Sequence, residues 1–166
     1  MSATPPDGVP PLTAVLPQTA VLPLTAEEEA VMRALGRLML VLPRSLNNDL
    51  ERGQRMTASE YSVLRNLSES RCGMMRMSEL AQACVMSLSG MTRLAAKLEA
   101  HGYLKRTKCP DDARGWNAVL TDKGLARLEE AWPTHLASVR RRIFDHLGDL
   151  DLPSLAKALN AIAGEA

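Results

Sequence analysis

Residues 77–124, MSELAQACVMSLSGMTRLAAKLEAHGYLKRTKCPDDARGWNAVLTDKG, decide the fold of this 166-residue chain. Their pattern predicts a short helix with Ser78 as its N-cap, a turn, a second helix over residues 87–101 and then a charged β-hairpin. Gly102 follows the second helix, at the position where a helix commonly ends with a glycine. We therefore expect a helix-turn-helix with a hairpin, or wing, after it.

The helix over residues 87–101 is predicted to have two faces. At about 100° per residue, one face collects the apolar side chains Leu88, Met91, Leu94, Ala95 and Leu98. Hydroxyl and cationic side chains point elsewhere, and such a helix suits insertion into a DNA major groove. We expect Ser87, Ser89 and Thr92 to contact phosphates or base edges. Arg93 and Lys97 are expected to contact guanine or phosphate, although both side chains also suit a solvated helix face.

The composition limits the class of protein. Only 3 % of the residues are aromatic and 46 % are apolar, so Leu, Met, Ala and Val must fill the core, which favours helices. The net charge is +1, but residues 87–114 hold six Lys or Arg against three acids, a local excess that suits nucleic acid. The N-terminus lacks the basic and apolar regions of a secretory signal, so we expect a cytoplasmic protein.

Four segments are expected along the chain. Residues 1–24 hold six of the ten prolines and no Lys or Arg, which predicts a flexible proline-rich arm. Residues 25–56 predict an N-terminal dimerisation helix that Pro43 kinks or interrupts and Gly53 ends. Residues 57–121 are expected to form the winged helix-turn-helix DNA-binding domain, and residues 122–166 the C-terminal dimerisation helices.

Several short signals support these boundaries. Thr25–Glu28 and Thr57–Glu60 match the capping box that opens a helix. Residues 103–108 and 116–120 resemble strands separated by CPDDARG, and Thr121 is expected to cap a long helix. An apolar stripe runs from Leu125 to Leu147, and residues 152–162 predict a last amphipathic helix. A partner subunit is the simplest cover for these stripes.

The chain resembles the MarR family of winged-helix transcription regulators. The resemblance covers residues from about 28 to the C-terminus, and its most specific parts are RMSELA (76–81), LEAHGYLKR (98–106) and PDDARGWNAVLTDKG (110–124). The wing of the family usually reads D-P-x-D-x-R. Here Cys109 replaces the first Asp, whereas Pro110, Asp112 and Arg114 match. The expected fold is mainly α (α+β), a winged helix-turn-helix with long N- and C-terminal helices forming a dimerisation region.

This resemblance implies a homodimer on a pseudo-palindromic DNA operator, most often as a repressor that a small ligand releases. The first, fifth and sixth helices would form the dimer, and Arg114 would enter the minor groove, held by Asp112. The same pair also suits a hairpin tip. The effector implied is a small aromatic or phenolic anion. Its candidate lining residues, between the dimer helices and the helix-turn-helix, are Arg33, Arg37, Tyr61 and Arg65.

Other functions have less support in the residues. Three cysteines without a C-x-x-C pair and three scattered histidines argue against a zinc site or a disulfide framework, so no metal or other cofactor is expected. Cys109 follows Arg106 and Lys108 on an expected exposed loop, which makes it a candidate redox cysteine. No catalytic motif indicates an enzyme. The alternative to a DNA-binding regulator is a helical protein–protein interaction module or anti-regulator that retains the fold.

Overall fold

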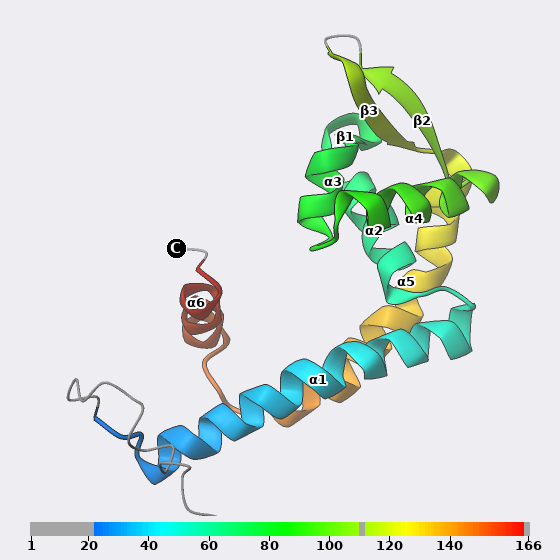
Figure 1. The fold of residues 1–166 in the computed structure, drawn as a ribbon. Helices are drawn as coiled ribbons and strands as arrows, with labels where there is room; N and C mark the ends of the chain where they lie inside the picture. Colours follow the sequence, from blue (N-terminus) through cyan, green and yellow to red (C-terminus); the bar gives the residue numbers. More distant parts are fainter. Residues whose placement is uncertain (1–21, 110–111, 165–166) are drawn as a thin grey trace, which may run out of the picture. The chain divides into compact units, whose positions relative to one another are not determined.

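The computed structural model describes residues 22–109 and 112–164, whose helices and strands are drawn in Figure 1. None of the helices described is long and apolar enough to cross a membrane. In chain order the elements are α1 (Ala26–Gln54), α2 (Ala58–Glu69), the 3-10 turn η2 (Arg71–Gly73), β1 (Met74–Arg76), α3 (Met77–Ala83), α4 (Leu88–Ala100), β2 (Leu104–Cys109), β3 (Asp112–Leu120), α5 (Asp122–Arg142), the 3-10 turn η3 (Phe144–His146) and α6 (Leu152–Ala163).

The chain divides into two units, residues 1–38 and 39–166, and α1 begins in the first and continues into the second. The predicted capping box at its start is confirmed, because Glu28 N donates to Thr25 Oγ1 at 3.2 Å and Thr25 N to the Glu28 carboxylate at 2.8 Å. The interruption expected at Pro43 is absent. Proline lacks one N–H, which removes one helical hydrogen bond, and α1 remains continuous to Gln54. Most of the predicted arm lies outside the described residues.

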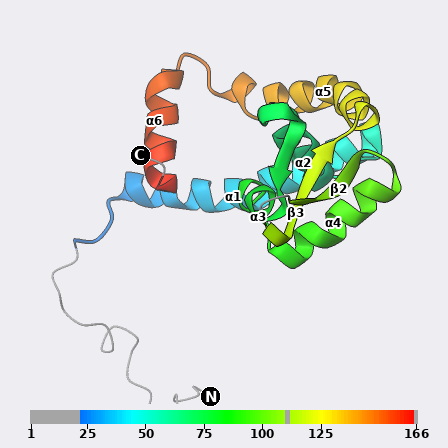
Figure 2. The same cartoon turned by 90° about the horizontal axis from the view of Figure 1, so that it is seen from above.

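The strands form a three-stranded antiparallel sheet in the order β1-β3-β2. β2 and β3 form the predicted hairpin, with Leu104 opposite Leu120 and Lys108 opposite Trp116. β1 is an addition that the sequence did not predict, and it pairs Met74 with Val119. Viewed from above, α3 and α4 lie beside these strands (Figure 2). The strand that directly precedes the helix-turn-helix thus belongs to the same sheet as the wing.

The start of α3 differs from the prediction. Its N-cap is Arg76 rather than Ser78, because Arg76 N donates to the Glu79 carboxylate at 3.3 Å and the strand β1 ends directly before the helix. The start and end of α4 are as predicted. Ser87 is its N-cap and accepts from Gly90 N at 3.1 Å, and Gly102 follows with a positive φ of 75°.

The LTDKG segment joins the wing to α5 through contacts with Tyr103. Thr121 N donates to the Tyr103 carbonyl at 3.2 Å, and the Thr121 hydroxyl caps α5 by accepting from Gly124 N at 3.0 Å. A Cβ on Gly124 would lie 1.9 Å from the same Tyr103 carbonyl oxygen. Only glycine therefore lets the first turn of α5 pack against the start of the hairpin.

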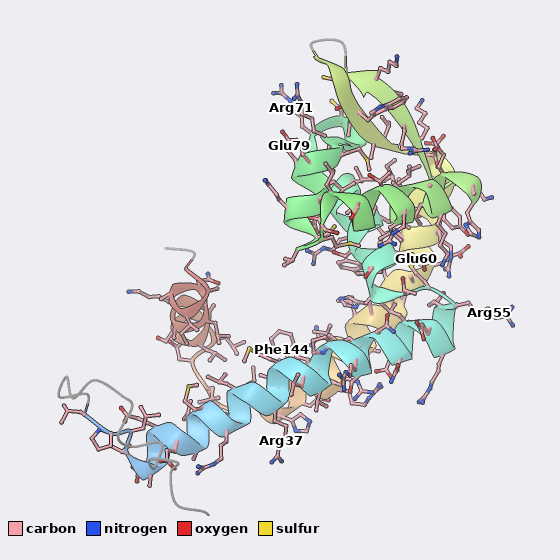
Figure 3. The ribbon with its side chains drawn as sticks, in the orientation of Figure 1. Arg37, Arg55, Glu60, Arg71, Glu79 and Phe144 are labelled. Atoms are coloured by element: carbon pink, nitrogen blue, oxygen red, sulfur yellow. The ribbon has the colours of Figure 1, made fainter. Side chains whose placement is uncertain are left out.

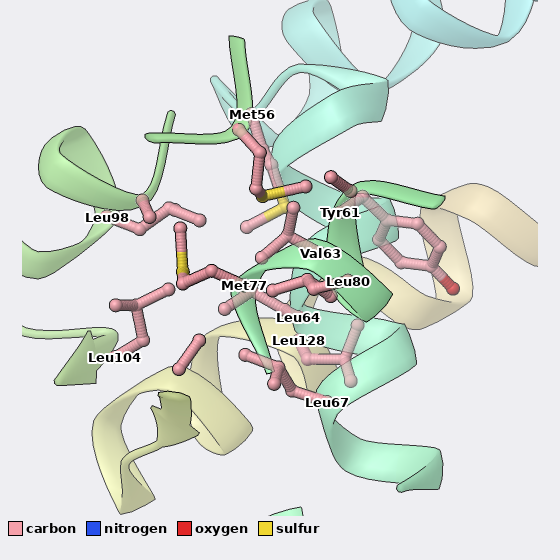
Figure 4. Packing of buried hydrophobic residues seen from close by; sticks show 14 of the residues in the cluster. Met56, Tyr61, Val63, Leu64, Leu67, Met77, Leu80, Leu98, Leu104 and Leu128 are labelled. Atoms are coloured by element: carbon pink, nitrogen blue, oxygen red, sulfur yellow. The ribbon is translucent and has the colours of Figure 1, made fainter. Parts of the chain in front are cut away.

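One hydrophobic core lies among α2, α3, α4, the sheet and the first half of α5 (Figure 4). Tyr61, Leu64 and Leu67 of α2 are buried in this core. On α4, the side chains of Met91, Ala95 and Leu98 are at most 1 % exposed. Other members of the core are Leu50, Met56, Val63, Leu64, Leu67, Met77, Leu80, Ala81, Leu104, Ala118, Leu128 and Ala131.

The C-terminal helices differ in part from the predicted stripe. α5 ends at Arg142, and the turn η3 separates it from α6, so the apolar spacing from Leu125 to Leu147 does not belong to one helix. α6 begins at Leu152, and Asp151 is its N-cap. The Asp151 carboxylate accepts from Ser154 N at 3.1 Å. None of the residues of α6 is buried. Its apolar face is open in a single chain.

Asp49 joins the second half of α1 to α5. Its carboxylate accepts from Arg142 Nε at 2.7 Å, from Arg141 Nη2 at 2.9 Å and from the buried Ser138 hydroxyl. The hydrogen bonds from Arg142 and Ser138 hold the pKa of Asp49 well below its ordinary value of 3.8, against the opposing effect of burial. The ionised form therefore stabilises the folded state.

Replacing Asp49 with Asn should lower the free energy of unfolding by about 2 kcal/mol at pH 7, because two cations lose their anionic partner. Since the pKa is lower in the folded state than the unfolded value of 3.8, the stabilisation is complete above about pH 5 and is lost as the pH falls below about 4. Urea unfolding at pH 7, 5 and 3, at one protein concentration, measures the difference between wild type and Asp49→Asn.

Glu29→Gln is the matched control. Glu29 pairs with Arg33 at 2.9 Å on an exposed helix surface, so its loss should change stability by no more than about 0.5 kcal/mol at any of these pH values. Equal losses for the two variants would contradict the role given to Asp49.

Candidate nucleic-acid interface

The face of α4 opposite the core carries the predicted recognition residues. Ser87, Ser89, Thr92 and Arg93 are all exposed, and Ser89, Thr92 and Arg93 line one shallow depression together with Leu88. The burial of Met91, Ala95 and Leu98 leaves this side of the helix facing solvent. The structure thus brings four of the predicted DNA-binding residues together on one surface.

Leu88 does not follow its predicted pattern. The spacing of apolar residues on α4 assigned it to the buried face, but its side chain is 56 % exposed. Leu88 is the first residue of α4, where the core no longer reaches under the helix. It belongs to the outer surface instead.

Two of the three predicted hydroxyls are used within the helix. Ser87 Oγ accepts from Gly90 N and lies 3.2 Å from Ser89 Oγ. Thr92 Oγ1 donates to the Leu88 carbonyl at 2.8 Å. Ser89 is therefore the hydroxyl of this surface best able to reach outward without giving up a backbone hydrogen bond.

Lys97 is held by a residue that the sequence did not single out for it. Its ammonium lies 2.7 Å from the carboxylate of Glu60, which is 7 % exposed and lies at the start of α2, below α4 (Figure 3). Burial opposes ionisation of Glu60, but hydrogen bonds from Lys97 and Thr57 outweigh it and lower its pKa. Arg93 has no such ion pair among the residues described. The two cations of α4 thus differ in their freedom to bind an outside anion.

Arg106 attaches the wing to the C-terminal end of α4. Its guanidinium contacts the Glu99 carboxylate at 2.7 and 2.8 Å, and its backbone N–H donates to the same carboxylate at 2.9 Å. β3 begins at Asp112, but the side chains of Asp112 and Arg114 lie outside the described part of the structure. Exposed Lys105 and Lys108 and the half-exposed ring of Trp116 cover the described surface of the hairpin.

Cys109 was expected on an exposed loop, and this expectation is wrong. It ends β2 with only 8 % of its surface exposed, and its thiol sulfur accepts from Arg76 Nη2 at 3.4 Å. Pairing with β3 continues as far as Cys109, opposite Asp112, so this residue belongs to the sheet and not to a loop. Cys84 is half-buried, and its sulfur accepts from Ser62 Oγ and Asn66 Nδ2, both at 3.7 Å.

A cavity of about 310 Å³ lies beside α2, away from the surface of α4. Tyr61 and Arg65, both predicted, line it, whereas Arg33 and Arg37 do not. Sequence spacing gave no sign of the other lining residues, because they come from distant parts of the chain. These residues are Leu42, Pro43, Leu46, Leu50, Ala58, Ser62 and His135.

Two residues that line this cavity each carry a buried polar atom with no hydrogen-bond partner among the described residues, Tyr61 Oη and His135 Nδ1. The two rings lie 4.3 Å apart. Burial raises the pKa of Tyr61 to about 12 and, with the nearby Arg65, lowers that of His135. Both groups are therefore neutral near pH 7, and each has an unused hydrogen bond.

Comparison with known proteins agrees with this geometry. A model of the MarR family matches residues 56–115. The structure of Sco3205, a MarR family transcriptional regulator from Streptomyces coelicolor, was solved in complex with DNA. Sco3205 is 35 % identical to this chain, with a TM-score of 0.78. The alignment covers 84 % of this chain and 88 % of that one. The present chain belongs to the MarR family.

Two further transcriptional regulators are similar over most of their length. AbsC, a MarR family regulator also from Streptomyces coelicolor, is 38 % identical with a TM-score of 0.77, over 85 % of this chain and 95 % of that one. YkoM, an uncharacterised HTH-type transcriptional regulator of Bacillus subtilis (strain 168), is 29 % identical over 69 % of this chain and 76 % of its own length. The predicted winged-helix fold and a role as a DNA-binding transcriptional regulator are confirmed, and the family is not one of enzymes.

Replacing Lys97 with Met should lower the free energy of unfolding by about 1–2 kcal/mol, because it leaves the buried Glu60 carboxylate without its cation. Adding Glu60→Gln should restore most of the loss, since a neutral amide needs no counter-charge. Arg93→Met, on the same helix, should change stability by less than about 0.5 kcal/mol. Urea unfolding of the wild type, the two single variants and the double variant measures these differences. Equal stability of Lys97→Met and Arg93→Met would contradict the role given to Lys97.

Proposed function

We propose that this MarR protein is a ligand-responsive repressor that binds a pseudo-palindromic operator as a homodimer, with one α4 helix in the major groove of each half-site. The observation that carries the proposal is the outer surface of α4. It combines Ser89, Thr92 and Arg93, which forms no ion pair among the described residues, beside a basic hairpin, on a helix whose opposite face is fixed in the core. Arginine forms bidentate hydrogen bonds with guanine, and short hydroxyl side chains fit close to base edges.

The wing supplies the second contact with DNA. Arg114, near the start of β3, is proposed to enter the adjacent minor groove, where narrow A·T-rich DNA concentrates negative potential. Asp112 is two residues away and can orient the guanidinium by a paired hydrogen bond. The anchoring of β2 to α4 through Arg106 and Glu99 supports this arrangement, because it fixes the distance between the two reading elements.

Homodimer formation is supported by apolar side chains that a single chain leaves exposed. On α1 these include Val31, Met32, Leu38 and Met39, and on α6 they include Leu152, Leu159 and Ile162. A second chain covering them would set the spacing of two α4 helices, which a pseudo-palindromic operator requires.

The cavity lined by Tyr61, Arg65 and His135 is the proposed effector site. A volume of about 310 Å³ lies at the small end of ligand pockets, and its walls are mainly aliphatic. The unpaired Tyr61 hydroxyl can donate to a carboxylate or phenolate, and Arg65 at the edge supplies positive charge. These features support a small aromatic or phenolic anion as the ligand. A ligand that binds more tightly, by about 3 kcal/mol, to a dimer whose two α4 helices do not match the operator spacing would lower operator occupancy on the order of a hundredfold.

Selection of bound fragments from a random DNA pool tests the function directly. The expected product is a family of pseudo-palindromes whose half-site centres lie about one helical turn apart, bound by two protein chains. Recovery of no enriched sequence, together with capture of one stoichiometric protein partner, would replace the proposal with a protein–protein interaction module.

Arg114→Ala should weaken binding to the selected operator by about 1–3 kcal/mol without changing the oligomeric state. The loss should be largest for operators with A·T pairs at the wing position. A gel-shift titration measures it, and Lys105→Ala, which removes an exposed cation from the same hairpin, is the control for a general loss of charge. An identical loss for both variants on A·T and G·C operators would remove Arg114 from specific recognition.

For the effector site, benzoate and its hydroxylated derivatives are the probes. One or more of them should release the operator from the wild-type protein, and Tyr61→Phe should raise the concentration needed by about tenfold, the effect of one lost hydrogen bond in a buried site. Tyr103→Phe, at a half-buried tyrosine that does not line the cavity, should leave that concentration unchanged. Equal release from Tyr61→Phe and wild type would contradict the assignment.

A further inference from the structure

Leu88 is an exposed aliphatic residue in the middle of the proposed DNA-reading surface. It lies one turn before Thr92 on α4, and both residues line the shallow depression shared with Ser89 and Arg93. They also line a second cavity, of about 370 Å³, between α4 and the hairpin. The polar contacts proposed above give no role to an aliphatic side chain at this position.

The Thr92 hydroxyl is already engaged on α4 itself. Its Oγ1 donates to the Leu88 carbonyl, 2.8 Å away along the helix. With its one proton used on the backbone, this hydroxyl can only accept from outside, and the Cγ2 methyl is the apolar group that the exposed side chain offers. Leu88 and Thr92 therefore form one apolar surface, four residues apart on one side of α4.

From this surface we propose that Leu88 and Thr92 read the 5-methyl group of thymine in the major groove. The thymine methyl is the one apolar group that base pairs display there, and it distinguishes T·A from every other pair. The positive charge of Arg93, which lines the same depression, favours DNA as the occupant. The inference rests on the proposed insertion of α4 into the major groove.

The side chains around the depression can contact different groups of the DNA. Arg93 can hydrogen-bond a guanine, Ser89 can reach a phosphate or base edge, and Leu88 with Thr92 excludes water from a methyl group next to them. Burying one methyl group corresponds to about fourfold in affinity, and two half-sites together to about fifteenfold. A selected operator should accordingly contain a thymine at the same position in each half-site.

Uracil substitution tests the contact without changing any hydrogen bond, because deoxyuridine differs from thymidine only by the missing methyl. Thymines of the selected operator are replaced one position at a time, in both half-sites, and affinities are measured by fluorescence anisotropy. The wild-type protein should lose about fifteenfold at one position. Leu88→Ala should bind the thymine and uracil operators with nearly equal affinity at that position.

Two substitutions of Thr92 separate its methyl from its hydroxyl. Thr92→Ser keeps the hydroxyl bond to the Leu88 carbonyl but removes the methyl, and it should reduce the preference for thymine. Thr92→Val keeps a methyl and removes the hydroxyl, and it should retain the preference. The opposite order would show that the hydroxyl reads the base and would overturn the role given to Thr92.

Val85→Ala is the matched control, since Val85 is 93 % exposed in the turn before α4 but does not line the depression. It should keep the wild-type preference for thymine. If the wild-type protein binds the operator but no uracil substitution weakens it, the thymine inference fails while the proposed function stands. If no DNA sequence is selected at all, the proposed function itself fails.

Discussion

The burial of one stripe of α4 is the constraint on which the rest of the structure depends. Met91, Ala95 and Leu98 are almost completely enclosed by α2, α3 and the sheet, so the helix cannot rotate about its axis without exposing them. Burying an aliphatic side chain of this size stabilises a fold by about 1.5–3 kcal/mol. The opposite face, with Ser89 and Arg93, is thereby held in solvent, where it can meet DNA.

Polar contacts then fix the C-terminal part of α4. Lys97 pairs with the buried Glu60 of α2, and Glu99 holds Arg106 of the wing. Glu60 directly precedes Tyr61, which lines the proposed effector cavity. The first turn of α2 thus contacts both the reading helix and the cavity, so a ligand that displaces Tyr61 has a short route by which to move α4.

Much of this arrangement follows from local sequence signals. The two capping boxes, the ends of α4, and the hairpin followed by Thr121 and Gly124 were predictable because each depends on neighbours in the chain. The exposure of Leu88 and the burial of Cys109 were not, because they depend on where the core and the sheet end in space. Glu60 was recognised as a helix cap, but its partner Lys97 lies 37 positions away, a pairing that spacing cannot reveal. The lining of the cavity, drawn from α1, α2 and α5, escaped prediction for the same reason.

Methylation protection of guanine N7 shows whether the outer face of α4 occupies the major groove. N7 lies in the major groove, so bound protein should protect guanines in two half-sites about one helical turn apart. Arg93→Ala should restore methylation at one guanine in each half-site while protection elsewhere persists. Full methylation of every guanine N7 in an operator that the protein demonstrably binds would contradict the account.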